Sequence, residues 1–479
     1  MTRPIVVITA ALVAAGIACA ATATSTATRS TAFTRTPLQI GAVVPELLDP
    51  NLQESTIALM QRANLADTAR VTVTWERSQT AMDPGLLSDL RNGVAMARAA
   101  GIDVYLDAYP ADSSQTPTTT AEQTRFATWL AGVVKGIPGL KHVIVGNEPN
   151  LNLFWSPQFG PSAQDTAAVG YERLLARTYD AVKRVAPRVD VVGGTLAHSG
   201  TNKRGTGRDT HSPSRFILDM GTAYRASHRT KPIMDAFSYH PYMERADLPP
   251  TFRHNPLANP VTIADYGKLI SSLERAFGGT KQKGEKLPLV YDEFGVEAKI
   301  PAAQASLYSG SEPATTHPVS EATQARYYAD GFHLAACQPT VRTIMVFRLI
   351  DSNFLASFQS GVYYADRVTP KSSRAAVAAA AKRFRSRTVA GCATLLAPKP
   401  LVDWRRRILT CDADCAYTET FRRAGSSRAV ATINDTTRAA IPTKLPRAKL
   451  PPGRYRITLR VTATAYKANA FTATSPPFG

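Results

Sequence analysis

Residues 103–150 read DVYLDAYPADSSQTPTTTAEQTRFATWLAGVVKGIPGLKHVIVGNEPN, and this stretch decides the fold. Short apolar runs at 103–106 and 142–145 predict strands, and the pattern at 122–134 predicts a helix between them. A strand, a helix and a strand in this order predict two parallel strands joined by a helical crossover. The second apolar run breaks directly into polar residues, which marks the end of a buried strand.

The same alternation continues on both sides of this unit. Eight runs predict strands: 40–44, 70–75, 103–106, 142–145, 189–192, 236–239, 289–291 and 343–347. Eight segments predict helices: 55–63, 86–100, 122–134, 166–185, 213–224, 263–277, 321–335 and 374–383. This alternation predicts an α/β protein with a closed (β/α)8 TIM barrel over residues 38–388. The alternative is a doubly wound open sheet, which usually has a glycine-rich phosphate turn after its first strand, and GAVVP at 41–45 is not one.

The long connections all lead from a strand to a helix. They cover residues 196–212, 243–261, 296–320 and 351–369, whereas most connections from helix to strand are short. In a (β/α)8 barrel, strand-to-helix loops lie on the C-terminal face, where active sites are built. We therefore expect a functional cleft on that face.

The pattern changes after residue 388. Runs at 404–409, 429–433 and 455–461 predict strands, and a Pro-Pro-Gly turn precedes the last of them. Residues 389–479 are predicted to form a small C-terminal all-β, sandwich-like domain. Carbohydrate binding and a purely structural role both remain open for it.

The N-terminus has the pattern of an export signal. Arg3 precedes an apolar run at 5–18, which is shorter than the ~20 residues that a spanning helix needs, and an A-x-A cleavage pattern follows at 18–20. Residues 1–20 are predicted to be a signal peptide, and the Ala/Thr/Ser-rich residues 21–37 a disordered lead-in. A secreted protein without membrane insertion is expected; an uncleaved anchor is the alternative.

Four cysteines follow the predicted signal. An even number in an exported chain favours disulfides, and we expect Cys411 to pair with Cys415 and Cys337 with Cys392. The stretch Cys-Asp-Ala-Asp-Cys lacks further ligands at zinc spacing, so no metal site is expected there.

The formal net charge of +19 is unevenly distributed. The last 91 residues contain 15 Lys and Arg and 5 Asp and Glu, which gives this part of the chain a charge of +10. A basic surface of this kind suits either an anionic cell-wall polymer or a merely soluble surface. No nucleic-acid-binding motif accompanies it, so nucleic acid is not expected as a partner.

Carboxylates follow two of the predicted strands. Asn147 and Glu148 come directly after the fourth strand, and Glu293 follows the seventh. Both strands end on the same face of a narrow barrel, so the two glutamates are expected to face each other. Paired carboxylates that flank a bond are what glycoside hydrolysis requires. A solvated strand end is the structural alternative for each motif alone.

With these motifs the sequence resembles clan A of the glycoside hydrolases, the cellulase-like (β/α)8 enzymes, over residues 38–388. The resemblance implies that Glu148 is the acid/base, Glu293 the nucleophile and Asn147 the contact to the sugar 2-hydroxyl. Arg70 is similar to the strand-two arginine of the clan, which supports the nucleophile. His240 and Tyr242 are similar to its strand-six His-x-Tyr, in which the tyrosine hydrogen-bonds the nucleophile.

One departure concerns the end of strand eight, where the clan often has a tryptophan platform and this chain has Phe-Arg-Leu at 347–349. A structural ion pair is the alternative role for Arg70, and a core position for His240.

Four aromatic residues near strand ends are candidates for stacking on sugar rings. They are Trp75, Tyr109, Phe154 and Trp155. Packing within the loops is the alternative for all four.

The expected activity is retaining hydrolysis of a β-linked glycan by a monomer, without a cofactor or metal. A non-catalytic carbohydrate- or cell-wall-binding barrel is the alternative, and transglycosylation would use the same residues. No serine-hydrolase elbow, zinc-protease helix, phosphate loop or dinucleotide fingerprint is present.

Overall fold

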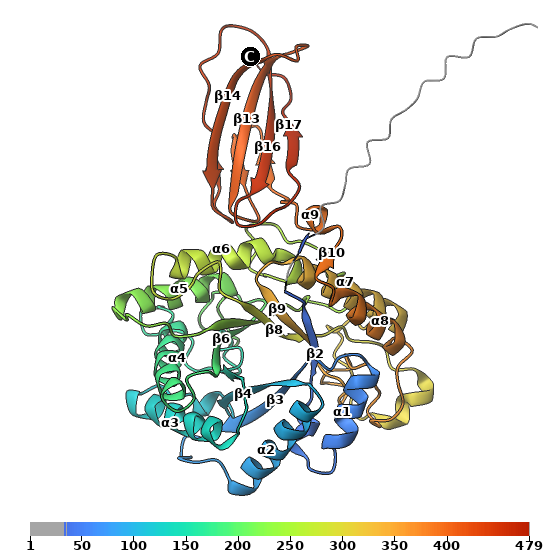
Figure 1. Cartoon of the computed structure of the whole chain (residues 1–479). Coiled ribbons are helices and arrows are strands. Elements are labelled where there is room, and N and C mark those ends of the chain that lie inside the picture. The colour runs from blue at the N-terminus through green and yellow to red at the C-terminus, as the bar shows by residue number, and fades with distance from the viewer. Residues whose placement is uncertain (1–32, 35, 479) are drawn as a thin grey trace, which may run out of the picture. The chain divides into compact units, whose positions relative to one another are not determined.

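Eight parallel strands close into a barrel in the computed structural model, which describes residues 33–34 and 36–478 (Figure 1). The strands are β2 (Gln39–Val43), β3 (Thr68–Trp75), β4 (Asp103–Pro110), β5 (His142–Val145), β6 (Asp190–Ala197), β7 (Ala236–His240), β8 (Leu289–Phe294) and β9 (Val341–Val346). Pairing of β2 with β9 closes the ring, with Gln39 opposite Thr343. The predicted (β/α)8 fold is confirmed.

A helix follows each barrel strand and covers its outer side (Figure 1). The helices are α1 (Gln53–Arg62), α2 (Pro84–Ala99), α3 (Thr120–Gly136), α4 (Thr166–Val185), α5 (Pro213–Ala226), α6 (Tyr266–Phe277), α7 (Glu321–Cys337) and α8 (Arg374–Phe384). Local sequence fixes where they start: a capping box of Thr119 and Glu122 begins α3, and the carboxylate of Asp83 caps α2 ahead of Pro84.

The apolar core has two layers within the barrel domain. The larger layer packs strands against helices. A separate cluster takes one residue from each of the six strands β4 to β9 and fills the barrel interior: Tyr105, Ile144, Val192, Ala236, Val290 and Met345. The barrel floor is therefore solid, and only its C-terminal mouth is left for a cleft.

Two antiparallel sheets make up the C-terminal domain. One has the order β11 (Leu401–Asp403), β12 (Ile408–Thr410), β15 (Thr443–Lys444), and the other has the order β14 (Ala429–Thr437), β13 (Cys415–Arg423), β16 (Tyr455–Ala463), β17 (Phe471–Thr474). Side chains of both sheets share one small core, which includes Leu409, Tyr417 and Leu459. The predicted all-β domain is confirmed.

Individual strands of this domain differ from the prediction. The predicted strand at 404–409 is wrong, because residues 404–407 form the turn between β11 and β12. The sequence analysis also missed β13, whose buried side alternates Cys415, Tyr417, Glu419 and Phe421. A buried glutamate interrupts the apolar period there, and its ion pair with Arg407 at 2.8 Å explains how it is tolerated.

The structure confirms one of the two predicted disulfides. Cys337 at the end of α7 is bonded to Cys392, the first residue of α9 (Cys392–Leu395). The pairing of Cys411 with Cys415 is wrong, since both are free thiols. Both are buried in the small apolar core of the β domain, where a thiol packs as a small hydrophobic side chain.

The predicted signal peptide and most of the predicted lead-in lie outside the described residues. Phe33–Thr34 form a short strand, β1, that pairs with β10 (Thr388–Val389) beside the end of α8. None of the helices in the described part of the chain is long and apolar enough to cross a membrane.

Candidate active site

A cleft of about 770 Å³ opens at the C-terminal mouth of the barrel. Five of the predicted site residues line it: Arg70, Asn147, Glu148, Tyr242 and Glu293. His240 ends β7 beneath the cleft and is fully buried. The parallel strands thus bring together side chains that are far apart in the sequence.

Glu148 follows β5 in a tight turn that its neighbours impose. Gly146 has φ of +93°, and a Cβ at this position would lie 2.8 Å from the ring of Tyr171, so only glycine fits. Glu148 itself has φ of +39°, and its backbone N–H donates to the carbonyl of Thr195. This turn ends the strand and places the Glu148 side chain at the cleft.

The two glutamates meet at the same ring nitrogen of His240. The ring Nδ1 lies 3.0 Å from Glu148 Oε1 and 3.5 Å from Glu293 Oε2. One carboxylate oxygen of each glutamate and a ring nitrogen of His240 all lie within 4.8 Å of one another. The close spacing fits the shorter of the two carboxyl separations used in glycoside hydrolysis, about 5–5.5 Å rather than about 6.5–9.5 Å.

Glu293 is held by two donors. The hydroxyl of Tyr242 donates to Oε2 at 2.8 Å, and Nη1 of Arg70 donates to Oε1. Arg70 also bonds Asp107 at 2.6 Å and lies 3.4 Å from Asp292. Burial alone would lower the pKa of Arg70, but the three surrounding carboxylates raise it well above its usual range. Arg70 is therefore a fixed positive charge that favours the ionised form of its partners.

His240 is a second buried cation. Its Nε2 lies 3.4 Å from Asp292 Oδ1, on the side of the ring away from Glu148 and Glu293. Burial works against the charged ring, but Glu293 and Asp292 together raise the pKa of His240 well above its usual range. We therefore expect the ring to carry both protons at neutral pH.

Asp107 and Asp292 contact Arg70 and His240 in the candidate site, and neither was predicted from the sequence. Burial raises the pKa of Asp107 to about 6 against the opposing effect of Arg70, whereas His240 and Arg70 overcome burial and lower the pKa of Asp292. Ser238 donates a hydrogen bond to Asp292. The predicted third strand stopped at Leu106, so Asp107 was not considered, although an aspartate inside an apolar strand was a usable signal.

Asn147 is oriented by Arg70. A guanidinium only donates hydrogen bonds, so its contact of 3.2 Å to Asn147 Oδ1 identifies that atom as the carbonyl oxygen. The amide NH2 group is then left to donate to a molecule in the cleft, which Asn147 lines.

The four aromatic candidates separate into two pairs. Tyr109 and Phe154 line the cleft, with their rings 6.1 Å apart in an edge-to-face contact. The other two predictions were wrong. Trp75 is five residues from Arg70 along β3, so it points to the opposite side of the strand, packs on Phe126 of α3 and is fully buried.

Trp155 also packs away from the cleft. It is buried in an edge contact with Tyr171 of α4, and its ring lies against Gly170, where a Cβ would come within 3.1 Å. The polar motif at Asn147 and Glu148, directly after β5, predicts where this loop starts. It does not predict which of the two adjacent aromatic residues, Phe154 or Trp155, faces the cleft.

Two further aromatic side chains line the cleft, and one of them, Phe358, was not predicted from the sequence. Phe347 and Phe358 line the cleft, and their ring centroids lie 6.2 Å from that of Tyr242 in each case. Phe358 is 38% exposed, so its ring is available to a ligand. It belongs to a long loop without periodicity, which explains why no sequence pattern singled it out.

Two groups of described residues have donor atoms close enough for a metal. The first is Glu148, His240 and Glu293. Its chemistry does not suit a cation, because Arg70 already occupies one oxygen of Glu293 and the raised pKa of His240 keeps the ring protonated.

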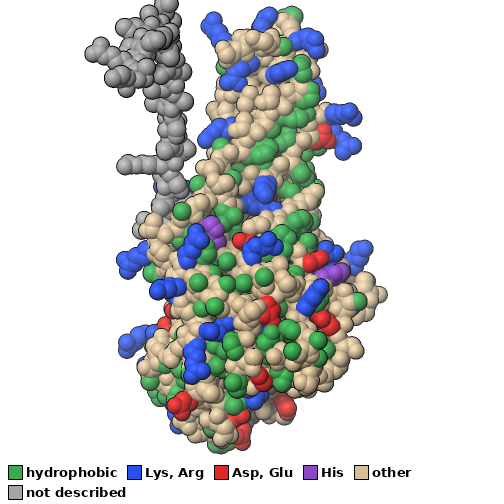
Figure 2. All heavy atoms as spheres, turned by 90° about the vertical axis from the view of Figure 1, so that its right-hand side faces the viewer, with side chains coloured by type: hydrophobic (Ala, Val, Ile, Leu, Met, Phe, Trp, Pro, Cys, Tyr) green, Lys and Arg blue, Asp and Glu red, His purple; other side chains and the backbone are tan. Residues whose placement is uncertain are grey.

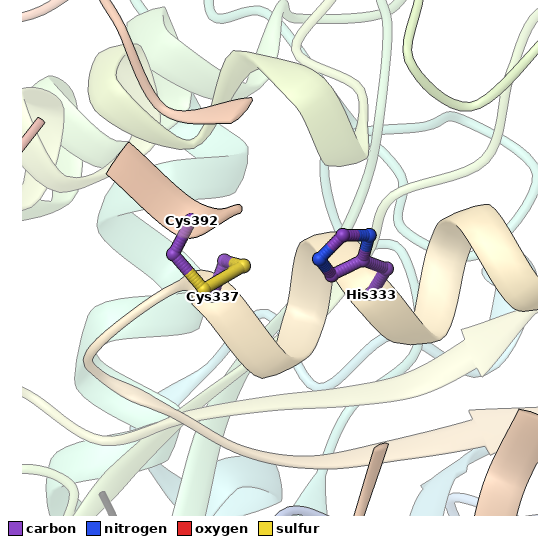
Figure 3. A group of neighbouring side chains, drawn as sticks. All are labelled: His333, Cys337 and Cys392. Atoms are coloured by element: carbon purple, nitrogen blue, oxygen red, sulfur yellow. A yellow bond between two sulfur atoms is a disulfide. The ribbon is translucent and has the colours of Figure 1, made fainter. Parts of the chain in front are cut away.

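The second group is His333, Cys337 and Cys392 (Figure 3). Its two sulfur atoms form the disulfide, and His333 is hydrogen-bonded to the carbonyl of Ala390 at 2.9 Å. A metal would need thiolates, so in this oxidised form the group is structural.

The fold is similar to solved structures of glycoside hydrolases. A family 39 glycoside hydrolase from the gut symbiont Bacteroides cellulosilyticus WH2 matches with a TM-score of 0.52 and 19% identity, over 82% of this chain and 74% of that chain. GH5_18 from Streptomyces cattleya, in complex with GlcNAc, matches with a TM-score of 0.51 and 16% identity, over 74% of this chain and 82% of that chain. No protein-family profile and no curated protein sequence matches the chain. The predicted resemblance to clan A is confirmed for the fold, at distant identity.

Proposed function

We propose that this protein is a retaining glycosidase that cleaves β-glycosidic bonds in an oligosaccharide or polysaccharide. The observation that carries the proposal is the pair Glu148 and Glu293, whose carboxyl oxygens lie within 4.8 Å of each other at the mouth of the barrel. A retaining double displacement needs two carboxyls at about this spacing, one as nucleophile and one as acid and base.

Glu293 is the nucleophile in this proposal. Arg70 and Tyr242 donate to its two oxygens, which fixes the carboxyl group and directs it at the anomeric carbon. Attack forms a glycosyl ester on Glu293 while the bond to the leaving oxygen breaks. The Asn147 amide is placed to donate to the sugar 2-hydroxyl beside this carbon.

Glu148 supplies the proton for the leaving oxygen. Its neighbour His240 is 3.0 Å away, and Glu293 and Asp292 raise the pKa of its ring against the effect of burial, so a proton can be shared across this pair. In the second step, Glu148 takes a proton from water as the water attacks the ester, and Glu293 leaves as the free carboxylate. A sugar acceptor in place of water would give transglycosylation with the same residues.

The deciding experiment uses aryl β-glycosides and measures the release of nitrophenol. We expect turnover by the wild type and none by Glu293→Ala; added azide should restore turnover by acting as a small external nucleophile and give an inverted product. Glu148→Gln should slow substrates with poor leaving groups by roughly 10²–10⁴-fold.

Glu54→Gln is the matched control, because Glu54 is an exposed glutamate in the first turn of α1 and does not line the cleft. Its activity should stay close to that of the wild type. Binding of glycans without turnover of any glycoside would instead favour the non-catalytic carbohydrate-binding alternative.

We further propose that the enzyme acts outside the cytoplasm. The export-signal pattern at 1–20 and the disulfide Cys337–Cys392 both support this, because disulfides persist in oxidising compartments. Amino-terminal sequencing of protein recovered from culture medium should find a start near residue 21; recovery only from the cytosol would contradict the proposal.

A further inference from the structure

A second cavity of about 460 Å³ lies entirely within the C-terminal β domain. It is bordered by the turn between β11 and β12, by side chains of β13 and β16, and by the final described residues. The lining residues that matter here are Trp404, Arg405, Arg407, Phe421, Arg447 and Phe478.

The lining of this cavity is cationic. Three arginines and no aspartate or glutamate line it. Arg407 is neutralised from beneath by Glu419, which is fully buried. Within the described part of the chain, no ion pair or side-chain hydrogen bond engages Arg405 or Arg447, and both are exposed. Two guanidinium groups at the rim therefore lack an anionic partner.

Arg407 is pinned in the wall of the cavity. Its Nη2 donates to Glu419 at 2.8 Å and to the carbonyl of Pro446, and its guanidinium lies 5.9 Å from the ring centroid of Phe421. An arginine fixed in this way keeps its direction without a ligand, which lowers the entropy cost of binding one.

Flat apolar surface lies beside these charges. Trp404 is half-buried against the domain core, and Phe478 is 38% exposed. Aromatic faces stack on the apolar faces of sugar rings, while guanidinium groups form paired hydrogen bonds with carboxylate, sulfate or phosphate. Aromatic and cationic groups together suit a ligand that has both rings and anionic groups.

The wider surface points to a polymer rather than to a small anion. Residues 389–479 carry a charge of +10, far more than three arginines supply. On the face shown in Figure 2, Lys and Arg side chains gather over the β domain, and acidic side chains are sparse there. A long anionic chain seated in the cavity would continue across this positive surface.

We propose that this cavity is a binding site for an anionic glycan, independent of the barrel cleft. The ligand is a polysaccharide with carboxylate, sulfate or phosphate groups, whose rings stack on Trp404 and Phe478 and whose anionic groups bind Arg405 and Arg447. The site would hold the enzyme on an acidic polymer while the cleft acts on a nearby chain.

The test measures equilibrium binding of the full chain to four probes: polygalacturonate, dextran sulfate, neutral dextran and duplex DNA. We expect binding to at least one acidic polymer and none to dextran, with affinity that falls as salt rises because exposed charges are screened. The two acidic probes separate carboxylate from sulfate recognition.

Arg405→Ala/Arg447→Ala is the informative variant, and we expect it to weaken binding at least tenfold. Arg406→Ala/Arg428→Ala removes the same charge from exposed positions outside the cavity, so it should change affinity less than twofold. Trp404→Leu keeps an apolar side chain in the core but removes the stacking face, and it should also weaken binding.

Equal losses of affinity in the two double variants would show that net charge alone causes binding, and would overturn the proposed site. Binding to neutral dextran as strong as binding to the acidic polymers would also overturn the proposal. So would tighter binding to duplex DNA than to both acidic polysaccharides, if Arg405→Ala/Arg447→Ala weakens that binding. The measurement involves no turnover, so failure of the proposed glycosidase activity would leave its outcome unaffected.

Discussion

At the scale of single residues, Arg70 determines the charge balance of the cleft. It contacts the carboxylates of Asp107, Asp292 and Glu293, and its side chain is only 3% exposed. Without it, three carboxylates would be left close together with one fewer buried cation. Glu293 would also lose one of the two hydrogen bonds that fix its direction.

We therefore expect Arg70→Met to abolish turnover and to lower the free energy of unfolding by about 3–5 kcal/mol, the usual result of removing one partner of a buried ion pair. Arg70→Lys should rescue little, since an ammonium cannot reach three partners as a planar fork. Kinetics and urea unfolding measure the two effects.

Arg215→Met serves as the control, because Arg215 forms an exposed pair with Asp219 on α5. Its effect on unfolding should stay within about 1 kcal/mol. If Arg70→Met unfolds with the same urea midpoint as the wild type, the ion pairs of Arg70 with its three carboxylates do not stabilise the barrel.

The residue scale is also where prediction from sequence was least complete. Glu148 and Glu293 were predicted from the polar residues that end two strands, and Arg70 from its similarity to the strand-two arginine of clan A. Trp155 was misplaced because its loop direction depends on packing against α4, which no local pattern encodes. Trp75 was misplaced although the two-residue period of β3 placed it on the side opposite Arg70.

At the scale of elements, the loop after β7 depends on one histidine. His254 Nδ1 lies 2.7 Å from Asp265 at the end of the short 3-10 helix Ile263–Asp265, and Nε2 lies 2.8 Å from Glu244 in the cleft wall. Burial opposes the charge of His254, but hydrogen bonds to Asp265 and Glu244 raise its pKa to about 9. The charged ring thus ties the cleft wall to the start of α6.

This linkage predicts a pH dependence of stability. Because the pKa of His254 is higher in the folded than in the unfolded protein, its contribution is complete below about pH 6.5, the usual histidine value, and is lost as the pH rises through about 9. Thermal unfolding between pH 6 and pH 10 should show a loss that His254→Gln lacks. A parallel decline in both proteins would assign the loss to other groups.

Strands and helices of the barrel were predicted closely, and those of the β domain less well. Barrel strands are buried on both sides and read as apolar runs, as in β5. In the β domain, Glu419 breaks the apolar alternation of β13, because its ion pair with Arg407 allows a charged side chain to be buried. The turn at 404–407 also breaks the pattern, because it divides an apparently continuous strand segment.

At the scale of the whole molecule, the disulfide encloses the last βα unit. Cys337 and Cys392 are 55 residues apart, and the segment between them contains β9 and α8. In the chain-entropy description a crosslink of this span stabilises the fold by about 4 kcal/mol, since it restricts the unfolded chain.

Cys337→Ser/Cys392→Ser should therefore lower the free energy of unfolding by about this amount, and dithiothreitol should destabilise the wild type but not this variant. Cys411→Ser/Cys415→Ser is the control, because these two thiols are free and should leave the response to reductant intact. Loss of that response in the control would mean that the second pair is the one oxidised in solution.

Residues in or shortly after all eight barrel strands line the cleft, and the ring is closed by β2 and β9 at opposite ends of the barrel sequence. Under the proposed function, no fragment of the barrel would be active, and activity should return during refolding only after the contacts between the two ends of the barrel sequence have formed. During synthesis, nearly the entire barrel would have to leave the ribosome before the cleft could act on a substrate.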